Sequence, residues 1–148
     1  MPHSRDDREE ERNKQVIRRL IEQSDRGNLD VVESLYSPEF VDHNPSAIRS
    51  PAHGAAGLRA VFAAVRKAFP DTQHTIHDLI AERDKVAVRI SARGTHTGEF
   101  LGVPPSGKIV EQTNIAIYRV VAGRITERWS YEVVGIPQQL GIVGRGSH

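Results

Sequence analysis

The motif "VDHNP" at residues 41–45 combines side chains that can carry acid/base chemistry on a carbonyl compound. A histidine such as His43 can take up or release a proton near neutral pH. The amide of Asn44 can donate a hydrogen bond to a developing enolate oxygen. We therefore consider His43 a candidate catalytic residue and Asn44 a candidate substrate-binding residue, with Asp42 as an alternative acid. The same motif is also typical of a turn in which Asp42 and Asn44 bond to nearby backbone.

Four further side chains are candidates for binding a ligand. Alternation along a strand places Arg89 on the face opposite Val88 and Ile90. It likewise places Gln112 on the face opposite Glu111 and Thr113. Facing inward, these polar groups can orient carbonyls; facing outward, they are only solvated. His96 stands in "GTHTG", where glycines remove bulk and can let a ligand approach the backbone, although a structural role fits equally. Trp129 can line a ligand site, a core or an interface.

Several other chemistries are excluded by the sequence. The chain has no cysteine, which excludes disulfides, thiolate catalysis and a cysteine-based zinc site. His74 and His77 are three apart on a predicted strand, so they point to opposite faces and are poorly placed to share a metal. Phosphate loops, G-x-S-x-G elbows and H-E-x-x-H motifs are absent. We therefore expect no metal site.

Composition points to one folded domain. The chain has 148 residues, of which 38% are hydrophobic and 26% charged, and these values fit a buried core. Its net charge of +1 gives no field that would attract nucleic acid or anionic lipid. No apolar run approaches the ~18 residues of a membrane span, and the charged start "MPHSRDDREEER" does not resemble a signal peptide. We expect one domain over residues 1–148, with flexible tails at 1–8 and 142–148, in the cytoplasm.

Hydrophobic periodicity changes once along the chain. It predicts helices at about 9–24, 29–36 and 58–69. Strand-like runs then follow at 73–82, 85–95, 108–120 and 124–134, with a small extra strand possible at 40–43. The compact turns "RDK" and "VAGR" favour antiparallel pairing. Segregated helices and strands predict an α+β fold, with helices on one face of a curved sheet and a cavity between them.

With this order of helices and strands, the chain resembles the SnoaL-like polyketide cyclases, or ester cyclases, of the nuclear transport factor 2-like superfamily. The most specific matching segment is "GTHTGEFLGVPPSGK", and the others are "YSPEFVDHNP", "GLRAVFAAVRKAFPD", "IYRVVAGRITERWSYE" and "QQLG". The resemblance implies a cone of three N-terminal helices packed on a strongly curved antiparallel sheet, commonly a homodimer through the sheet. It also implies no metal or organic cofactor, and ring closure of a polyketide ester by intramolecular aldol condensation.

The resemblance also implies an acid/base carboxylate near the end of the last strand. The family pattern is like W-x-x-x-D-x-x-G followed by QLG, whereas this chain reads "SYEVVGIPQQLG" after Trp129. Counting back from Gly135 places Glu132 at the acidic position, and counting forward from Trp129 places Val133 there. Glu132 is the nearby carboxylate that can take the role, provided that burial or a neighbour raises its pKa toward neutrality.

These observations leave three hypotheses open. The first is a cofactor-free acid/base enzyme acting on a carbonyl-bearing small molecule, as in a polyketide cyclase. The second is a non-catalytic protein of the same fold that binds a small apolar ligand or serves as a dimeric scaffold. The third is an isomerase or an epoxide-hydrolase-like enzyme, which would need paired carboxylates and an arginine converging on a water molecule.

Overall fold

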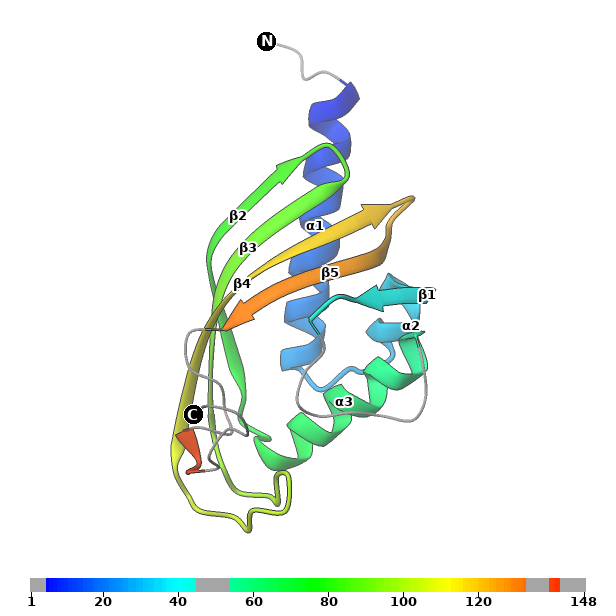
Figure 1. Cartoon of the computed structure of the whole chain (residues 1–148). Helices are drawn as coiled ribbons and strands as arrows, with labels where there is room; N and C mark the ends of the chain where they lie inside the picture. The colour runs from blue at the N-terminus through cyan, green and yellow to red at the C-terminus, as the bar shows by residue number, and fades with distance from the viewer. Residues whose placement is uncertain (1–4, 45–53, 133–138, 142–148) are drawn as a thin grey trace.

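The structure is a computed structural model that describes residues 5–44, 54–132 and 139–141. It has helices and a five-stranded sheet, as expected for an α+β protein. Figure 1 shows the three helices on one side of the sheet and the long strands β3 and β4 bending around them. In chain order, the described elements are α1 (Arg5–Asp25), α2 (Val31–Leu35), β1 (Tyr36–Asp42), α3 (Gly54–Ala68), β2 (Gln73–Glu82), β3 (Lys85–Thr95), β4 (Ile109–Val121) and β5 (Arg124–Glu132).

The sheet is mixed rather than wholly antiparallel. Its strand order is β1-β5-β4-β3-β2. Strands β2 to β5 form the antiparallel meander that the sequence predicts. The small additional strand exists, but β1 pairs in parallel with β5, where Asp42 faces Arg128 across the pair. The chain can make this parallel pair because α3 and the meander separate the two strands in sequence, which leaves ample length for a crossover.

The turns have the backbone geometry of tight hairpins. Ala122 and Gly123 both have positive φ (50° and 77°) between β4 and β5, as a two-residue turn of the twisted sheet requires. At the N-terminus α1 begins at Arg5, so it takes in residues 5–8 of the tail predicted at 1–8. Residues 1–4, 133–134 of the last predicted strand, and the predicted tail at 142–148 lie outside the described residues.

The main core lies between α1, α2 and the end of the sheet at the β4–β5 turn. Ile17 of α1 is completely buried, as are Val86, Val120 and Ile125 of the sheet. Tyr36 joins this core and makes an edge-on contact with Phe40, with the two ring centroids 4.8 Å apart. Because the helices bury one apolar face each, the inner face of the sheet is covered along α1 and α3. No helix in the described ranges is long and apolar enough to cross a membrane.

The connection between β3 and β4, residues 96–108, folds back against the end of α3. The backbone N–H groups of Thr97 and Gly98 both donate to the carbonyl of Ala68, at 3.0 and 3.1 Å. A Cβ atom at Gly98 would collide with the carbonyl of Lys67, so this close approach needs glycine. The loop then carries Phe100 into a second apolar cluster with Phe69 and Val110. This connection therefore closes one end of the space between α3 and the sheet.

Candidate functional site

A cavity of about 320 Å³ lies between the helices and the inner face of the sheet. Helices α1 and α3 supply a mainly apolar wall through side chains such as Leu20, Phe62 and Val65. The sheet supplies a mixed wall, in which apolar residues alternate with amides, hydroxyls and charged groups. Apolar pockets with a few convergent polar groups are typical of sites for small organic molecules.

Strand register arranges the polar residues of the cavity in rows across the sheet. Gln112 on β4 is paired with Ala92, which in turn is paired with His74 on β2. The next inward position of β4 is Asn114. Because side chains of one face recur every second residue, the lining residues of β4 are a direct consequence of its period. No described residue makes a hydrogen bond with the side chain of Gln112 or Asn114, so both amides can meet a ligand.

One end of the cavity holds a charged pair. Asp42 Oδ2 and Arg128 Nη1 are 3.2 Å apart, and their side chains are 18% and 20% exposed. Burial opposes the charge of Arg128, but Tyr118 and Asp42 outweigh it and raise the pKa of the guanidinium. Burial also raises the pKa of Tyr36 well above its ordinary value, so this phenol stays neutral. The arrangement is an ion pair beside the neutral phenol of Tyr36 in the cavity wall.

Asn44 lies beside this pair and lines the cavity. Its backbone N–H donates to Asp42 Oδ1 at 3.1 Å, which is the local turn predicted for the motif. Its side-chain oxygen accepts the backbone N–H of Ser130 at 3.0 Å. Since the oxygen is engaged, the Nδ2 group of Asn44 remains as a donor in the cavity wall.

The other end of the cavity holds a histidine–carboxylate pair that the sequence did not reveal. His74 Nδ1 is 2.6 Å from Asp25 Oδ1, and both residues line the cavity. Alternation from Ile76 could have placed His74 on the inner face. Asp25, however, is 49 positions away in sequence, and no local pattern links the two. Among the described residues, no group of three His, Cys, Asp or Glu side chains could hold a metal ion.

Position 132 is the last residue of β5 and pairs with Asn114. The lining residues of β5 are Arg128 and Ser130, not Trp129. The two-residue period therefore assigns position 132 to the strand face that contributes to the cavity. The acid/base role of Glu132 stays a prediction.

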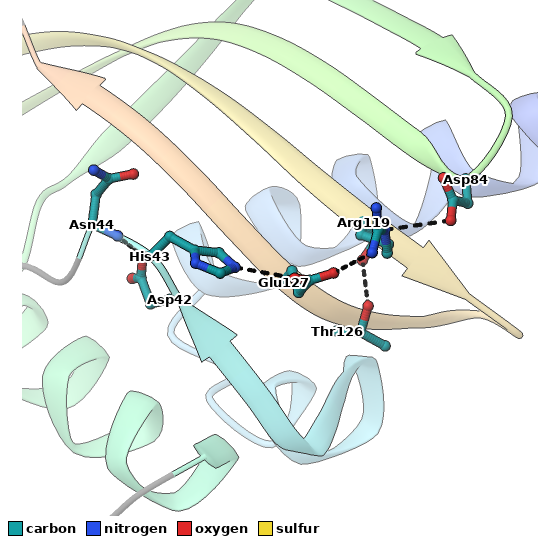
Figure 2. A network of polar contacts seen from close by, with 7 residues as sticks. All are labelled: Asp42, His43, Asn44, Asp84, Arg119, Thr126 and Glu127. Carbon is teal, nitrogen blue, oxygen red and sulfur yellow. Dashed lines mark hydrogen bonds and ion pairs between the residues drawn. The ribbon is translucent and has the colours of Figure 1, made fainter.

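The predicted residues His43 and Trp129 lie on the opposite, outer face of the sheet (Figure 2 shows His43). Their rings stack, with centroids 4.7 Å apart and planes 3° from parallel. His43 Nε2 also hydrogen bonds with Glu127, which in turn pairs with Arg119. The His43 hydrogen bond and the charge of Arg119 lower the pKa of Glu127. Neither His43 nor Trp129 is among the residues that line the cavity.

Arg89 and His96 are also outside the cavity lining. Arg89 forms a half-exposed ion pair with Asp78, at 2.6 Å, on β2 and β3. His96 is completely buried in the β3–β4 connection, where its Nδ1 hydrogen bonds with Ser106 and its ring packs near Phe69. Of the predicted binding residues, the structure therefore brings Asn44 and Gln112 into the cavity and leaves the other three elsewhere.

The fold and the lining define an α+β protein with a cavity between its helices and the inner face of its sheet. The comparison with known proteins is more specific: a sequence model described as SnoaL-like polyketide cyclase matches residues 14–140. The chain belongs to the SnoaL-like polyketide cyclase family.

Three similar proteins come from Streptomyces species. The chain is 26% identical to the aklanonic acid methyl ester cyclase DnrD of Streptomyces peucetius over an alignment of 134 positions, which covers 85% of this chain and 88% of that protein. Among solved structures it is similar to IdmH, a candidate polyketide cyclase from Streptomyces antibioticus, with 33% identity, a TM-score of 0.71, and coverage of 87% and 98% of the two chains. It is also similar to AclR, a candidate hydroxylase from Streptomyces galilaeus, with 28% identity, a TM-score of 0.76, and coverage of 91% and 88%.

Proposed function

We propose that the protein closes a ring in a small carbonyl-bearing polyketide ester by cofactor-independent acid/base catalysis of an intramolecular aldol reaction. The observation that carries the proposal is the cavity, whose helical wall is mainly apolar and whose sheet wall carries the amides of Gln112 and Asn114, with which no described residue makes a hydrogen bond. Family membership and the similarity to ester cyclases support the reaction type. A cavity of about 320 Å³ lies at the small end of the range for organic ligands, about 300–1,000 Å³.

The proposed polar contacts follow from the reaction. Removal of a proton from a carbon between two carbonyls creates an enolate, whose oxygen needs hydrogen-bond donors. Gln112 and Asn114 present such donors from adjacent inward positions of β4, and Asn44 presents its Nδ2 from the neighbouring end of β1. The positive charge of Arg128 favours the same developing negative charge. Because Asp42 holds the guanidinium in place, little reorganisation is needed when the charge forms.

Glu132 is the proposed carboxylate of the family pattern. Its strand position, opposite Asn114, would bring a carboxylate to the end of the amide row. In this proposal the carboxylate exchanges protons with the substrate, and the side chains of the outer face have no part in the chemistry. A Glu132→Gln variant keeps the size of the side chain and removes its basic oxygen, so the proposal predicts a lower kcat.

The test is turnover of aklanonic acid methyl ester by the purified protein, followed by chromatography and mass spectrometry. Ring closure by an aldol reaction gives a product of unchanged mass, whereas epoxide hydrolysis adds one water and hydrolysis of the methyl ester releases methanol and leaves an acid that is lighter by a CH₂ group. We expect Gln112→Leu to lower kcat/KM by roughly 10- to 100-fold, since it removes a donor to the developing charge. Thr113→Val, at the outward position next to it, is the matched control and should retain the rate. Binding without any product, for this ester and for simpler β-keto esters, would favour a ligand-binding protein.

The outer face of the sheet is the proposed homodimer interface. Ile115 is 52% exposed and lies directly across from Tyr131, which is 72% exposed. The neighbouring pair is Ile117 and Trp129, so large apolar side chains from β4 and β5 form one patch. Such a patch on an exposed sheet face is typical of a protein–protein contact. A second copy would bury the same residues on both sides of a two-fold axis.

A further inference from the structure

The end of α1 and the start of β2 are joined by an ion pair inside the cavity wall. Asp25, the last residue of α1, accepts the backbone N–H of His74 on Oδ2 at 2.8 Å. Its other oxygen, Oδ1, is 2.6 Å from the ring atom Nδ1 of His74. The side chains of Asp25 and His74 are 14% and 30% exposed, respectively. Two contacts through one carboxylate fix both the position and the rotation of the imidazole ring.

This contact determines which ring nitrogen carries the proton. An ionised carboxylate only accepts hydrogen bonds, so Nδ1 of His74 is the protonated nitrogen and Nε2 carries the lone pair. No described residue makes a hydrogen bond with Nε2. The imidazole is therefore held in the wall of the cavity as a base whose acceptor nitrogen can meet a ligand. A carboxylate behind an imidazole also stabilises the charge that forms when the ring takes up a proton.

The surroundings of the pair suit a ligand carbonyl. Ala92 lies between His74 and Gln112 in the cross-strand row, and its small side chain leaves space between the base and the amide. Ser24 Oγ is buried without a hydrogen-bond partner among the described residues, and Ser24 lines the same cavity. The charged groups nearby are Asp25 from α1, Arg66 from α3 and Arg93 from β3. Arg66 donates to the carbonyl of Ser24 at 3.2 Å, which keeps its positive charge at this end.

We propose that the Asp25–His74 pair is the general base that forms the enolate. Nε2 of His74 takes the proton from the carbon between two carbonyls, and the C–H electron pair moves to the carbonyl oxygen near Gln112. The enolate carbon then attacks a further carbonyl elsewhere in the same substrate, a C–C bond forms as the C=O electron pair moves to oxygen, and the new alkoxide takes the proton of the imidazolium. Bonds and protons balance without an added reactant. This inference rests on the proposed function in one respect: it assumes that the substrate has a C–H group between two carbonyls.

The first step can be measured without ring closure. Methyl benzoylacetate in D₂O exchanges its acidic C–H for deuterium, and the loss of the proton signal is followed by ¹H NMR. His74→Asn keeps a donor close to the position of Nδ1 and can preserve the contact with Asp25, but it has no Nε2. We expect the enzyme-catalysed exchange to fall by roughly 10²-fold or more in this variant, with little change in the thermal midpoint.

Asp25→Asn tests the orientation of the ring. The side-chain oxygen of the new amide would stay with the backbone N–H of His74, so its NH₂ would face Nδ1 and move the ring proton to Nε2. We expect the exchange rate to fall by a similar factor, because the base is then protonated at the reacting nitrogen. His77→Asn is the matched control on the same strand: its ring bonds with Ser91 and is not part of the cavity wall. This variant should exchange at the wild-type rate.

The outcomes separate the two proposals. Exchange at the wild-type rate in folded His74→Asn would overturn the pair as the base, and so would a wild-type protein that gives no exchange above buffer. If His74→Asn does not fold, His74→Gln takes its place with the same expectation. Exchange that depends on His74, without ring closure of the polyketide ester, would support the base and reject the proposed cyclisation.

Discussion

The ion pair between Asp42 and Arg128 gives a quantitative test of how strongly the cavity wall shields charges from water. The change is Asp42→Asn, which removes the negative charge but keeps an oxygen that can accept the Asn44 N–H. At the observed 3.2 Å, two unit charges attract by about 5 kcal/mol if the effective dielectric constant is about 20. The cost of removing the charges from water offsets part of this attraction. Breaking a fully buried pair costs roughly 3–5 kcal/mol, and the observed exposure of 18% and 20% reduces that cost. We therefore expect a loss of about 2 kcal/mol in the free energy of unfolding.

The matched control is the pair Arg89–Asp78 on the outer face, whose atoms are 2.6 Å apart but whose side chains are 49% and 52% exposed. Although the control contact is shorter, water screens it, so Asp78→Asn should cost less than about 1 kcal/mol. Both variants are measured by urea unfolding at pH 7, and a double-mutant cycle with Arg128→Met isolates the coupling energy. Equal losses for the two variants would refute the reasoning, because distance rather than burial would then set the strength of the pairs.

Two further predictions concern pH and assembly. Hydrogen bonds from the backbone and side chain of Thr95 lower the pKa of Asp71. A carboxylate whose folded-state pKa is depressed stabilises the fold above its ordinary pKa of about 3.9 and loses that contribution as the pH falls through the folded value. The stability difference between wild type and Asp71→Asn should therefore be constant near neutral pH and shrink below about pH 4 in acid titrations; a difference that grows there would contradict the assignment. For assembly, Ile117→Arg should convert the proposed dimer to a monomer in sedimentation velocity, while Ile80→Arg, on edge strand β2, should remain dimeric. A wild-type monomer at all concentrations would remove the interface proposal.

Local sequence patterns predicted most of the elements because those elements depend on local periodicity. Strands β2 and β3 begin and end at the predicted residues, since β-branched runs are bounded there by polar turns. The sequence analysis did not predict the parallel pairing of β1 with β5, because a tight turn in the sequence indicates only that the two strands it joins are antiparallel neighbours. Pairing across α3 depends on long-range packing, which has no local signature.

The candidate site was predicted only in part for a related reason. The alternation of "VDHNP" separates His43 from Asp42 and Asn44, but it does not say which face is inside. In the structure, Asp42 and Asn44 line the cavity, whereas His43 stacks on Trp129 on the outer face of the sheet. A histidine was expected in the site, and one is present, but it is His74. Its partner Asp25 is brought to it by the packing of α1 on β2.

The position of the proposed base also bears on the segment after Trp129, where the chain departs from the family pattern. If that strand supplies the group that takes the C–H proton, its carboxylate must be closely aligned with the reacting carbon. With Asp25 and His74 forming the enolate from the other end of the cavity, a carboxylate at position 132 needs only to pass the proton of the imidazolium on to the new alkoxide oxygen. Proton exchange with oxygen tolerates a longer side chain and a shifted register better than removal of a proton from carbon, which demands close alignment. The roles assigned to His74 and Glu132 therefore predict different effects of the two variants on deuterium exchange and ring closure. Glu132→Gln should slow ring closure while leaving deuterium exchange into methyl benzoylacetate intact, and His74→Asn should abolish both. If Glu132→Gln lost deuterium exchange to the same extent as His74→Asn, the general base would instead be assigned to Glu132 on the last strand.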